Sequence, residues 1–461
     1  MTRLRKWQAQ CVNEAIRHYQ SDKHFFCQAT PGAGKTIMAA ELAARMREAG
    51  RVDFVLCFSP SIAVAESMRS AFSKRLKARF DAKIGAIGGS FTYQAMQHLN
   101  EEFWSLLNEH RVLVILDEIH HCAVLEYGVG NAWGQLILSR IQHHAAYTLA
   151  LSGTPWRSDR LPITLACYTD KSGQIRPNYI YRFSSAISEG VCRVPQIILV
   201  DNEELQITTG ETSTQSFKSI ESLLAESRIG YSAVLRNHEA LKYLVGTACE
   251  RLQKVRQLVP DAAGLVVTSS VGHAEQVAGV LRARGESVVV VNYQTANAQG
   301  LIKRFRNSSE HWIVSIGMIS EGTDIPRLQV CCHVSRIRTE LYFRQILGRI
   351  LRRRKIGDDK AWLYVFAEPT LSQFAQRVAE DLPEHNAVSH KMFGLALTPD
   401  GSPLESNYNN LHSAGDLVDL NIEGPQKNTV ELSFDPKSRE QMLSFAGQYR
   451  RKMIQIYESP F

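Results

Sequence analysis

The stretch Ala29-Thr-Pro-Gly-Ala-Gly-Lys-Thr36 lies between an apolar segment at 25–27 and an Ala-rich amphipathic pattern at 37–47. A strand, a glycine-rich turn and a helix in that order predict a loop whose backbone N–H groups bind phosphate oxygens. Lys35 is expected to neutralise the β- and γ-phosphates, and the Thr36 hydroxyl to hold Mg²⁺. Ala29 stands where the strict pattern has glycine, so the alternative is a plain strand–helix turn. The phosphate-binding backbone is expected at Thr30, Gly32, Ala33 and Gly34.

The apolar run Val112-Leu-Val-Ile-Leu116 precedes Asp117-Glu-Ile-His120. A continuous apolar run predicts a buried parallel strand, and open α/β sheets bind ligands at the carboxyl ends of such strands. We expect Asp117 to serve the metal and Glu118 to orient water. Acidic strand ends are common by themselves, so the interpretation depends on the phosphate loop as well. Together the two stretches predict hydrolysis of a nucleoside triphosphate.

Composition sets the broad class. The 461 residues exceed one ordinary core and predict two or three domains. A net charge of +7 favours a polyanionic partner, although a small excess over this length also arises by chance. Nine cysteines without a Cys-x-x-Cys pair favour reduced thiols in a cytosol. The sequence contains no apolar stretch of about 20 residues and begins without a signal-peptide pattern, so we expect a cytoplasmic protein without a membrane span.

Short apolar runs alternate with helical patterns, which predicts an α/β fold of parallel sheets covered by helices. A first α/β domain is expected over residues 1–195 and a second over 264–370. Expected strands of the first are Phe25–Cys27, Phe54–Phe58, Ile84–Ile87, Val112–Leu116 and Tyr147–Leu151. Expected strands of the second are Leu265–Thr268, Ser287–Val291, Ile313–Ile316, Val330–Val334 and Ala361–Val365.

Two further segments complete the predicted organisation. Residues 196–263 are interpreted as a connector with a helical insertion over Phe217–Gln257. Residues 371–461 form a C-terminal extension, loop-dominated over Leu382–Asn428, with a terminal amphipathic helix at Ser438–Tyr457. That helix carries Arg450, Arg451 and Lys452, which we interpret as a solvated face.

The ordered motifs resemble superfamily 2 helicases and translocases of the DExH type, which have two RecA-like domains in tandem. Leu4–Gln8 is similar to the adenine-reading Q element, Ala29–Thr36 to motif I and Asp117–His120 to motif II. Ser152–Pro155 is similar to motif III, Ser320–Pro326 to motif V and Gln345–Arg352 to motif VI. A single match of this kind could arise by chance. Six matches in the family's order, across roughly residues 4–352, are very improbable as a coincidence.

The resemblance implies ATP and Mg²⁺ as cofactors and a role for each motif residue. Gln8 would read adenine, and Asp324 would contact the ribose or help position the cleft. His120 would couple to Gln345, and Ser152 and Thr154 would link the ATP site to the cleft. Ser152 and Thr154 are also ordinary caps before Pro155. Arg349 and Arg352, spaced i and i+3, would act as arginine fingers from one helical face; surface ion pairs are their alternative. His121 is interpreted as structural.

Nucleic-acid contacts are expected where polar residues follow strands. Ser59-Pro60-Ser61 and Thr92-Tyr93-Gln94 resemble motifs Ia and Ib, and Thr268-Ser269-Ser270 and Thr323 would supply the matching contacts from the second domain. Such residues would bind the phosphate backbone without reading bases, although strand-end caps use the same residues. His273–Arg284 is interpreted as a plain amphipathic helix. A narrower similarity is to bacterial or phage helicases related to restriction-enzyme motor subunits. No nuclease core is assigned, because Asp400 and Glu405 lie in a turn-rich stretch.

These observations predict an ATP-dependent nucleic-acid helicase or translocase, with DNA favoured over RNA. A double-stranded DNA translocase within a larger restriction or defence complex, acting with protein partners and without strand separation, is the alternative. A nucleotide-dependent scaffold is the third, and retention of Lys35, Glu118 and Arg349 argues against it.

Overall fold

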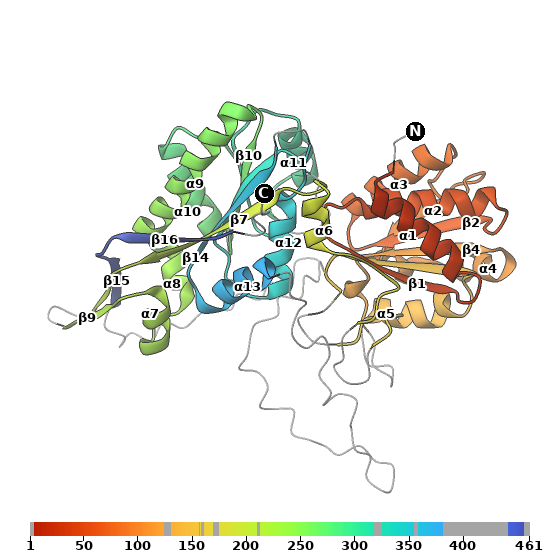
Figure 1. Cartoon of the computed structure of the whole chain (residues 1–461), viewed down its shortest axis with the longest axis horizontal. Coiled ribbons are helices and arrows are strands. Elements are labelled where there is room, and N and C mark those ends of the chain that lie inside the picture. Colours follow the sequence, from red (N-terminus) through yellow and green to blue (C-terminus); the bar gives the residue numbers. More distant parts are fainter. Residues whose placement is uncertain are drawn as a thin grey trace, which may run out of the picture.

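The computed structural model describes residues 4–123, 131–155, 157, 161–168, 175–209, 213–317, 325–354, 358–380 and 441–455. They form two α/β lobes side by side, the first in red to orange and the second in green to blue (Figure 1). The predicted fold class, two parallel-sheet lobes in tandem, is confirmed. No helix among the described residues is long and apolar enough to cross a membrane.

The first lobe has a six-stranded parallel sheet in the order β3-β2-β4-β5-β1-β6. Its strands are β1 (His24–Ala29), β2 (Phe54–Ser59), β3 (Gly88–Thr92), β4 (Val112–Asp117), β5 (Tyr147–Ser152) and β6 (Tyr179–Tyr181). Its helices are α1 (Lys6–His18), α2 (Lys35–Glu48), α3 (Ile62–Leu76), η1 (Gln94–His98), α4 (Glu101–Glu109), η2 (Ile119–His121), α5 (Ala132–Leu136), η3 (Ile137–Gln142) and α6 (Phe183–Ser188).

Strand β4 explains why the sequence of this sheet reads as continuous apolar runs. Val112 and Val114 pack into one buried cluster, and Leu113 and Ile115 into another on the opposite face. Alternate residues of a strand point to opposite faces, so a strand covered on both sides is apolar throughout. The parallel arrangement also brings the carboxyl ends of β1, β4 and β5 to one edge.

The second lobe has a seven-stranded sheet in the order β11-β12-β10-β13-β14-β7-β16, parallel except for β16. Its strands are β7 (Val194–Asn202), β10 (Ala263–Val267), β11 (Val288–Val291), β12 (Trp312–Ser315), β13 (Leu328–His333), β14 (Lys360–Phe366) and β16 (Tyr449–Gln455). A three-stranded antiparallel sheet contains β8 (Leu205–Thr209), β9 (Ser213–Phe217) and β15 (Gln441–Phe445). The helices are α7 (Ile220–Glu226), α8 (Tyr231–Arg236), α9 (His238–Leu258), α10 (Val271–Ala283), α11 (Ala298–Arg306), α12 (Glu340–Ile350) and α13 (Pro369–Ala379).

The expected terminal helix at Ser438–Tyr457 is wrong. Residues 441–455 form β15 and β16, which pair with β8 and β7 from much earlier in the chain. Long-range pairing satisfies these backbone groups and overrides the local helical pattern. The basic cluster therefore lies on an edge strand, and Arg450, Arg451 and Lys452 are exposed as expected.

The expected strand at Ile84–Ile87 is also wrong. Ile84 is 98% exposed, and β3 begins at Gly88. A Cβ on Gly88 would lie 1.9 Å from the carbonyl oxygen of Val55 on β2, so glycine is required for the pairing. Glycine has low strand propensity, which is why the pattern missed this strand.

Segment 196–263 contributes directly to the second lobe. Strand β7 pairs in parallel with β14, and α9 packs on β13 and β14. The helical stretch expected over Phe217–Gln257 is divided into α7, α8 and α9, and the polar stretch before it forms β8 and β9. The domain limits at 195, 263 and 370 stay predictions.

A buried ion pair joins the start of β7 to the rest of the second lobe. Arg193 has 0% exposure, and its Nε and Nη2 atoms donate to the two oxygens of Asp358 at 2.7 and 2.6 Å. Its Nη1 atom also donates to the carbonyl oxygens of Leu328 and Ile350, at 2.5 and 2.7 Å. One guanidinium thereby connects the starts of β7 and β13 with the end of α12.

We expect Arg193→Met to lower the free energy of unfolding of the second lobe by about 3–5 kcal/mol, because Asp358 would be left as a buried charge without its cation. Urea unfolding followed by tryptophan fluorescence measures this. The control is Arg140→Met, which removes an ion pair with Glu101 at the surface and should change the midpoint little. Equal shifts for the two variants would contradict the assigned role.

Candidate functional site

The phosphate loop connects β1 to α2 and has the backbone that phosphate binding requires. Gly32 and Gly34 have φ angles of +81° and +92°, in the left-handed region that favours glycine. Gly34 is the N-cap residue of α2, so the N-terminus of the helix faces the loop. A Cβ on Gly34 would also lie 2.8 Å from Gln8 Nε2. The sequence pattern predicted this geometry because only glycine adopts it without strain.

The Q element holds the loop from the side of α1. Arg5 Nη1 donates to the carbonyl oxygen of Ala33 at 2.6 Å, and Gln8 Nε2 donates to that of Gly34 at 2.9 Å. Trp7 stacks on Tyr181 with ring centroids 4.7 Å apart, which anchors the start of α1 to β6. Gln8 therefore lies at the site, where its amide supports the loop, and its contact with adenine stays a prediction. Arg5 was missed, because motif matching emphasised the glutamine.

Lys35 and Glu118 connect the loop to the end of β4. Lys35 Nζ lies 3.2 Å from Glu118 Oε1 and donates to the carbonyl oxygen of Ala29 at 3.3 Å. Glu118 has a φ angle of +49°, unusual for a residue with a side chain, and its Oε2 accepts the Gly153 N–H at 3.3 Å. This conformation turns the carboxylate towards the loop, where a water attacking a phosphate would be activated.

Asp117 is the residue best suited to a cation. Burial and, to a smaller extent, the negative charge of Glu118 raise the pKa of its carboxyl to about 7, against the opposing charge of Lys35. A divalent cation would favour the ionised form that burial disfavours. Thr36 follows Lys35 at the start of α2, and its side chain is partly exposed. Hard oxygen donors of this kind fit Mg²⁺, and Thr36 and Asp117 are the residues that would hold it.

His120 and Ser152 link motif II to motif III. His120 Nδ1 lies 2.9 Å from Ser152 Oγ, which also accepts the backbone N–H of Thr154 at 3.1 Å. Thr154 is buried, 3% exposed. Arg157 Nη1 donates to the carbonyl oxygen of His120 at 2.7 Å, a contact that no motif predicted. The coupling of His120 to Gln345 stays a prediction.

The second lobe reaches the phosphate loop through α12 and the segment after it. A Cβ on Gly348 would lie 2.7 Å from Pro31 Cβ, and one on Gly32 would lie 3.2 Å from Arg352 Cγ. Cys192 Sγ donates to the Pro31 carbonyl oxygen at 3.7 Å, another contact that sequence analysis missed. Motif VI is therefore brought to motif I, across the boundary between the lobes.

The expected helical spacing of the two arginines is wrong. Helix α12 ends at Ile350, and Arg352 lies beyond it in an antiparallel bridge with Cys192. Pairing with the chain before β7 ends the helix earlier than the sequence suggested. Burial lowers the pKa of Arg352 to about 10, so its guanidinium remains charged at neutral pH. Arg349 and Gln345 lie on α12, and their roles stay predictions.

Three residues expected to contact nucleic acid make hydrogen bonds within the protein, and their contacts with nucleic acid stay predictions. Tyr93 is fully buried, and its hydroxyl donates to the Asp117 carbonyl oxygen at 2.8 Å. The buried Ser59 hydroxyl donates to the Phe91 carbonyl oxygen at 3.3 Å. The Thr268 hydroxyl donates to the Ser315 carbonyl oxygen, also at 3.3 Å. These three side chains stabilise strand ends, which is the alternative role considered above.

The remaining candidates keep an open role. Pro60 and Thr92 are partly exposed at the carboxyl ends of β2 and β3, and the Thr92 hydroxyl caps the Ala95 N–H at 3.2 Å. Contacts from these two residues stay predictions. Thr323 and Asp324, like most of motif V, lie outside the described residues.

Comparison with known proteins shows which families and structures this chain is similar to. Residues 1–157 match the family described as type III restriction enzyme, res subunit. The resemblance to superfamily 2 motors is confirmed. An uncharacterized protein of Mycobacterium leprae is 28% identical over 391 residues, 81% of this chain and 64% of the relative. Another from Mycobacterium tuberculosis H37Rv is 29% identical over 390 residues, 81% of this chain and 62% of the relative.

This chain thus spans less than two thirds of the mycobacterial relatives. A more distant relative, named DNA 3'-5' translocase XPB2, from Sulfurisphaera tokodaii, is 24% identical over 386 residues, 76% of this chain and 79% of the relative.

Solved structures share the fold at low identity. A fragment from Vibrio vulnificus, described as an HsdR subunit of a type I restriction enzyme, aligns with a TM-score of 0.56 at 17% identity, covering 82% of this chain and 67% of that one. Dbp5 of S. cerevisiae, bound to RNA and ADP BeF3, aligns with a TM-score of 0.52 at 12% identity, covering 82% and 87%. These structures agree with two RecA-like lobes and show the fold alone.

We expect Gly34→Ala to weaken nucleotide binding at least tenfold, because the new Cβ would meet Gln8 and the left-handed backbone would cost about 1–2 kcal/mol. Binding of a fluorescent ATP analogue measures this. Gly50→Ala is the matched control, since Gly50 also has a positive φ, +65°, but no atom lies within 4 Å of its Cβ position. Loss of affinity in the control to the same extent would show that general strain is responsible.

Proposed function

We propose that this chain is an ATP-dependent nucleic-acid motor, a helicase or translocase, with DNA favoured as its polymer. The observation that carries the proposal is the convergence of both lobes on one phosphate loop. The first lobe contributes Lys35, 3.2 Å from Glu118, and the second contributes Gly348 beside Pro31. A site divided between two lobes can couple nucleotide binding to their relative movement, which is what stepping along a strand requires.

The roles of the residues in hydrolysis follow from their positions. When phosphates occupy the loop, Lys35 exchanges the Glu118 carboxylate for phosphate oxygens. Glu118 is then available to orient and deprotonate the attacking water. Thr36 and Asp117 would hold Mg²⁺, which would neutralise part of the phosphate charge. Arg352 and Arg349 would supply positive charge from the second lobe, a contribution of about 10³–10⁵ in rate for an arginine finger.

The choice of DNA is supported by the comparisons. One distant relative is named a DNA translocase, and residues 1–157 match a restriction-enzyme family. The net charge of +7 agrees with a polyanionic partner. Because residues 1–157 match a family described as a restriction-enzyme subunit, we include action within a larger complex of proteins in the proposal.

ATP hydrolysis should be stimulated by nucleic acid and should depend on two residues in different ways. Lys35→Ala should weaken nucleotide binding or turnover, because the loop loses its fixed positive charge. Glu118→Gln should lower turnover by about 10²–10⁴ while sparing binding, because an amide cannot accept the proton of water. Phosphate release with single-stranded, duplex and forked DNA and with RNA measures turnover.

Glu109→Gln is the control for these variants, since Glu109 is an exposed carboxylate at the end of α4. It should hydrolyse ATP like the unmodified protein. Ordinary turnover by Glu118→Gln would reject the role of that carboxylate. A large preference for RNA in the same panel would overturn the choice of DNA.

The second candidate is a double-stranded DNA translocase without strand separation, favoured by the relative that is named a translocase. Strand-displacement and triplex-displacement assays, run side by side with ATP, separate the two. A helicase should release the strand of a partial duplex. Triplex displacement without unwinding would select the translocase, and neither activity in the presence of ATP hydrolysis would contradict both.

A further inference from the structure

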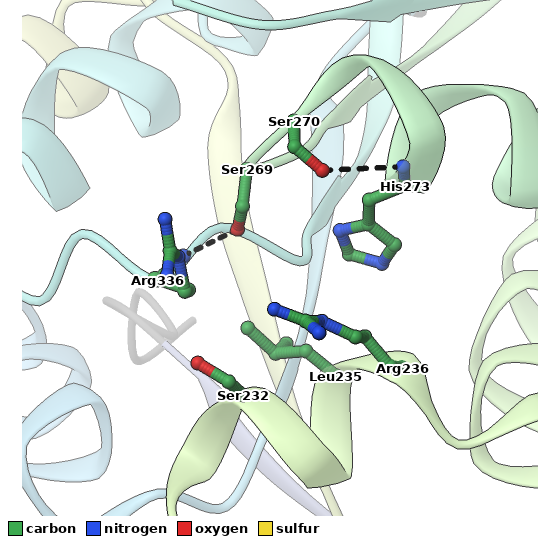
Figure 2. A pocket seen from close by; sticks show the side chains of 7 residues that line it. All are labelled: Ser232, Leu235, Arg236, Ser269, Ser270, His273 and Arg336. Carbon is green, nitrogen blue, oxygen red and sulfur yellow. Dashed lines mark hydrogen bonds between the residues drawn. The ribbon is translucent and has the colours of Figure 1, made fainter. Parts of the chain in front are cut away.

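A small pocket in the second lobe lies outside the nucleotide site. Its wall is made by α8, the turn between β10 and α10 with the first turn of α10, and the segment after β13 (Figure 2). The polar residues that line it are Ser232, Arg236, Ser269, Ser270, His273 and Arg336. No carboxylate lines the pocket. Only Ser269 and Ser270 belong to a stretch that was considered for nucleic-acid binding, so most of the pocket was unexpected.

Two arginines give the pocket a concentrated positive charge. Arg236 and Arg336 are exposed, and neither guanidinium has a carboxylate within ion-pair distance among the described residues. The neighbouring Arg338 differs, because it pairs with Glu368 at 2.8 Å. Figure 2 shows the Arg236 side chain crossing the pocket below His273, with Arg336 on the far side. Two cations from separate elements around one hollow are a feature of anion sites.

The pocket is held in shape by hydrogen bonds that do not use the guanidinium groups. The Arg336 backbone N–H donates to Ser269 Oγ at 2.9 Å, which leaves the hydroxyl hydrogen of Ser269 available as a donor. Gln276 Nε2 donates to the Arg236 carbonyl oxygen at 2.9 Å and so fastens α8 to α10. Ser270 caps α10 by accepting the His273 N–H at 3.3 Å. The positive end of the α10 dipole therefore faces the pocket.

His273 provides an independent sign that a ligand is missing. It is 6% exposed, and its buried Nε2 atom has no hydrogen-bond partner among the described residues. Buried polar atoms are nearly always paired in native structures, so an orphaned one points to a missing group. Burial lowers the pKa of His273, an interaction with the Leu235 backbone opposes that shift, and the nearby charges of Arg236 and Arg336 lower the pKa further.

We propose that this pocket binds one phosphate group of the nucleic-acid backbone, held jointly by Arg236 and Arg336 with donors from Ser232, Ser269 and the start of α10. The inference rests on the proposed motor function and adds a contact point to it. The pocket lies at the carboxyl edge of the second sheet, the edge where parallel sheets bind ligands. Helix α8, which comes from the expected connector, would thereby become part of the polymer path.

The test is a salt series of binding to a mixed-sequence single-stranded DNA oligonucleotide, measured by fluorescence anisotropy with a non-hydrolysable ATP analogue. Arg236→Ala and Arg336→Ala should each lower affinity about tenfold at moderate salt. In the double variant the log–log salt slope should become shallower by about 0.7, the value for one neutralised phosphate. Arg336→Lys should keep the slope, because it keeps the charge.

The control is Lys254→Ala, which removes an exposed cation near the end of α9, just before β10 begins at the opposite edge of the sheet. Its affinity and slope should match the unmodified protein. Variants at the pocket that behave like this control would overturn the inference while leaving the motor function intact. If the log–log salt slope of the double variant became shallower by about 1.4, the two arginines would neutralise two separate phosphates. That result would reject a single phosphate held by both.

A thermal-shift arm with inorganic phosphate distinguishes the source of the anion. Phosphate could stabilise the unmodified protein and not the double variant, while the two proteins bind DNA with equal affinity. In that case the pocket is a site for small anions, and its assignment to the polymer is wrong. If the unmodified protein binds no DNA or RNA, both this inference and the proposed function fail.

Discussion

The contact between Lys35 and Glu118 is the interaction on which the candidate site depends. It joins the loop after β1 to the end of β4, although another strand, β5, lies between those strands in the sheet. The carboxylate reaches the loop because Glu118 takes a left-handed conformation directly after the strand. The surrounding structure maintains that conformation, since Gly153 donates to Glu118 and Asp117 is buried beside it. Strain of this kind is retained mainly at functional positions.

A second set of contacts connects the phosphate loop to helix α1 on one side and to the second lobe on the other. The carbonyl oxygens of Ala33 and Gly34 are held by Arg5 and Gln8, and the other side of the loop touches the second lobe near Gly348. Phosphates entering this loop would change the partners of Lys35 in the first lobe, while Pro31 of the same loop touches the second lobe. In the proposed function, this arrangement would connect hydrolysis to movement between the lobes through direct contacts.

The second lobe is assembled from segments far apart in the sequence. Strand β7 and the C-terminal strand β16 complete the sheet, and Arg193 with Asp358 connects β7 to β13 and α12. Tyr449 stacks on Tyr243 of α9 with centroids 3.9 Å apart, so the C-terminal strand β16 also supports the helix that follows α8. Asn237, which follows Arg236, donates to the carbonyl oxygen of Leu443 on β15 at 2.9 Å, so the C-terminal strands also hold the end of α8.

The sequence by itself determined the α/β class, most of the strands, and the phosphate loop with its acidic partners. These features depend on local rules: apolar periodicity, and residue types that phosphate and metal chemistry require at short spacing. Only the tertiary structure decided that residues 441–455 are strands, that Arg352 lies beyond α12, and that Tyr93 is buried under Asp117. It alone brought Arg5, Cys192 and Arg157 to the site and Arg236 beside Arg336. Such contacts join residues distant in sequence, where packing and backbone pairing override local propensity, so no spacing pattern predicts them.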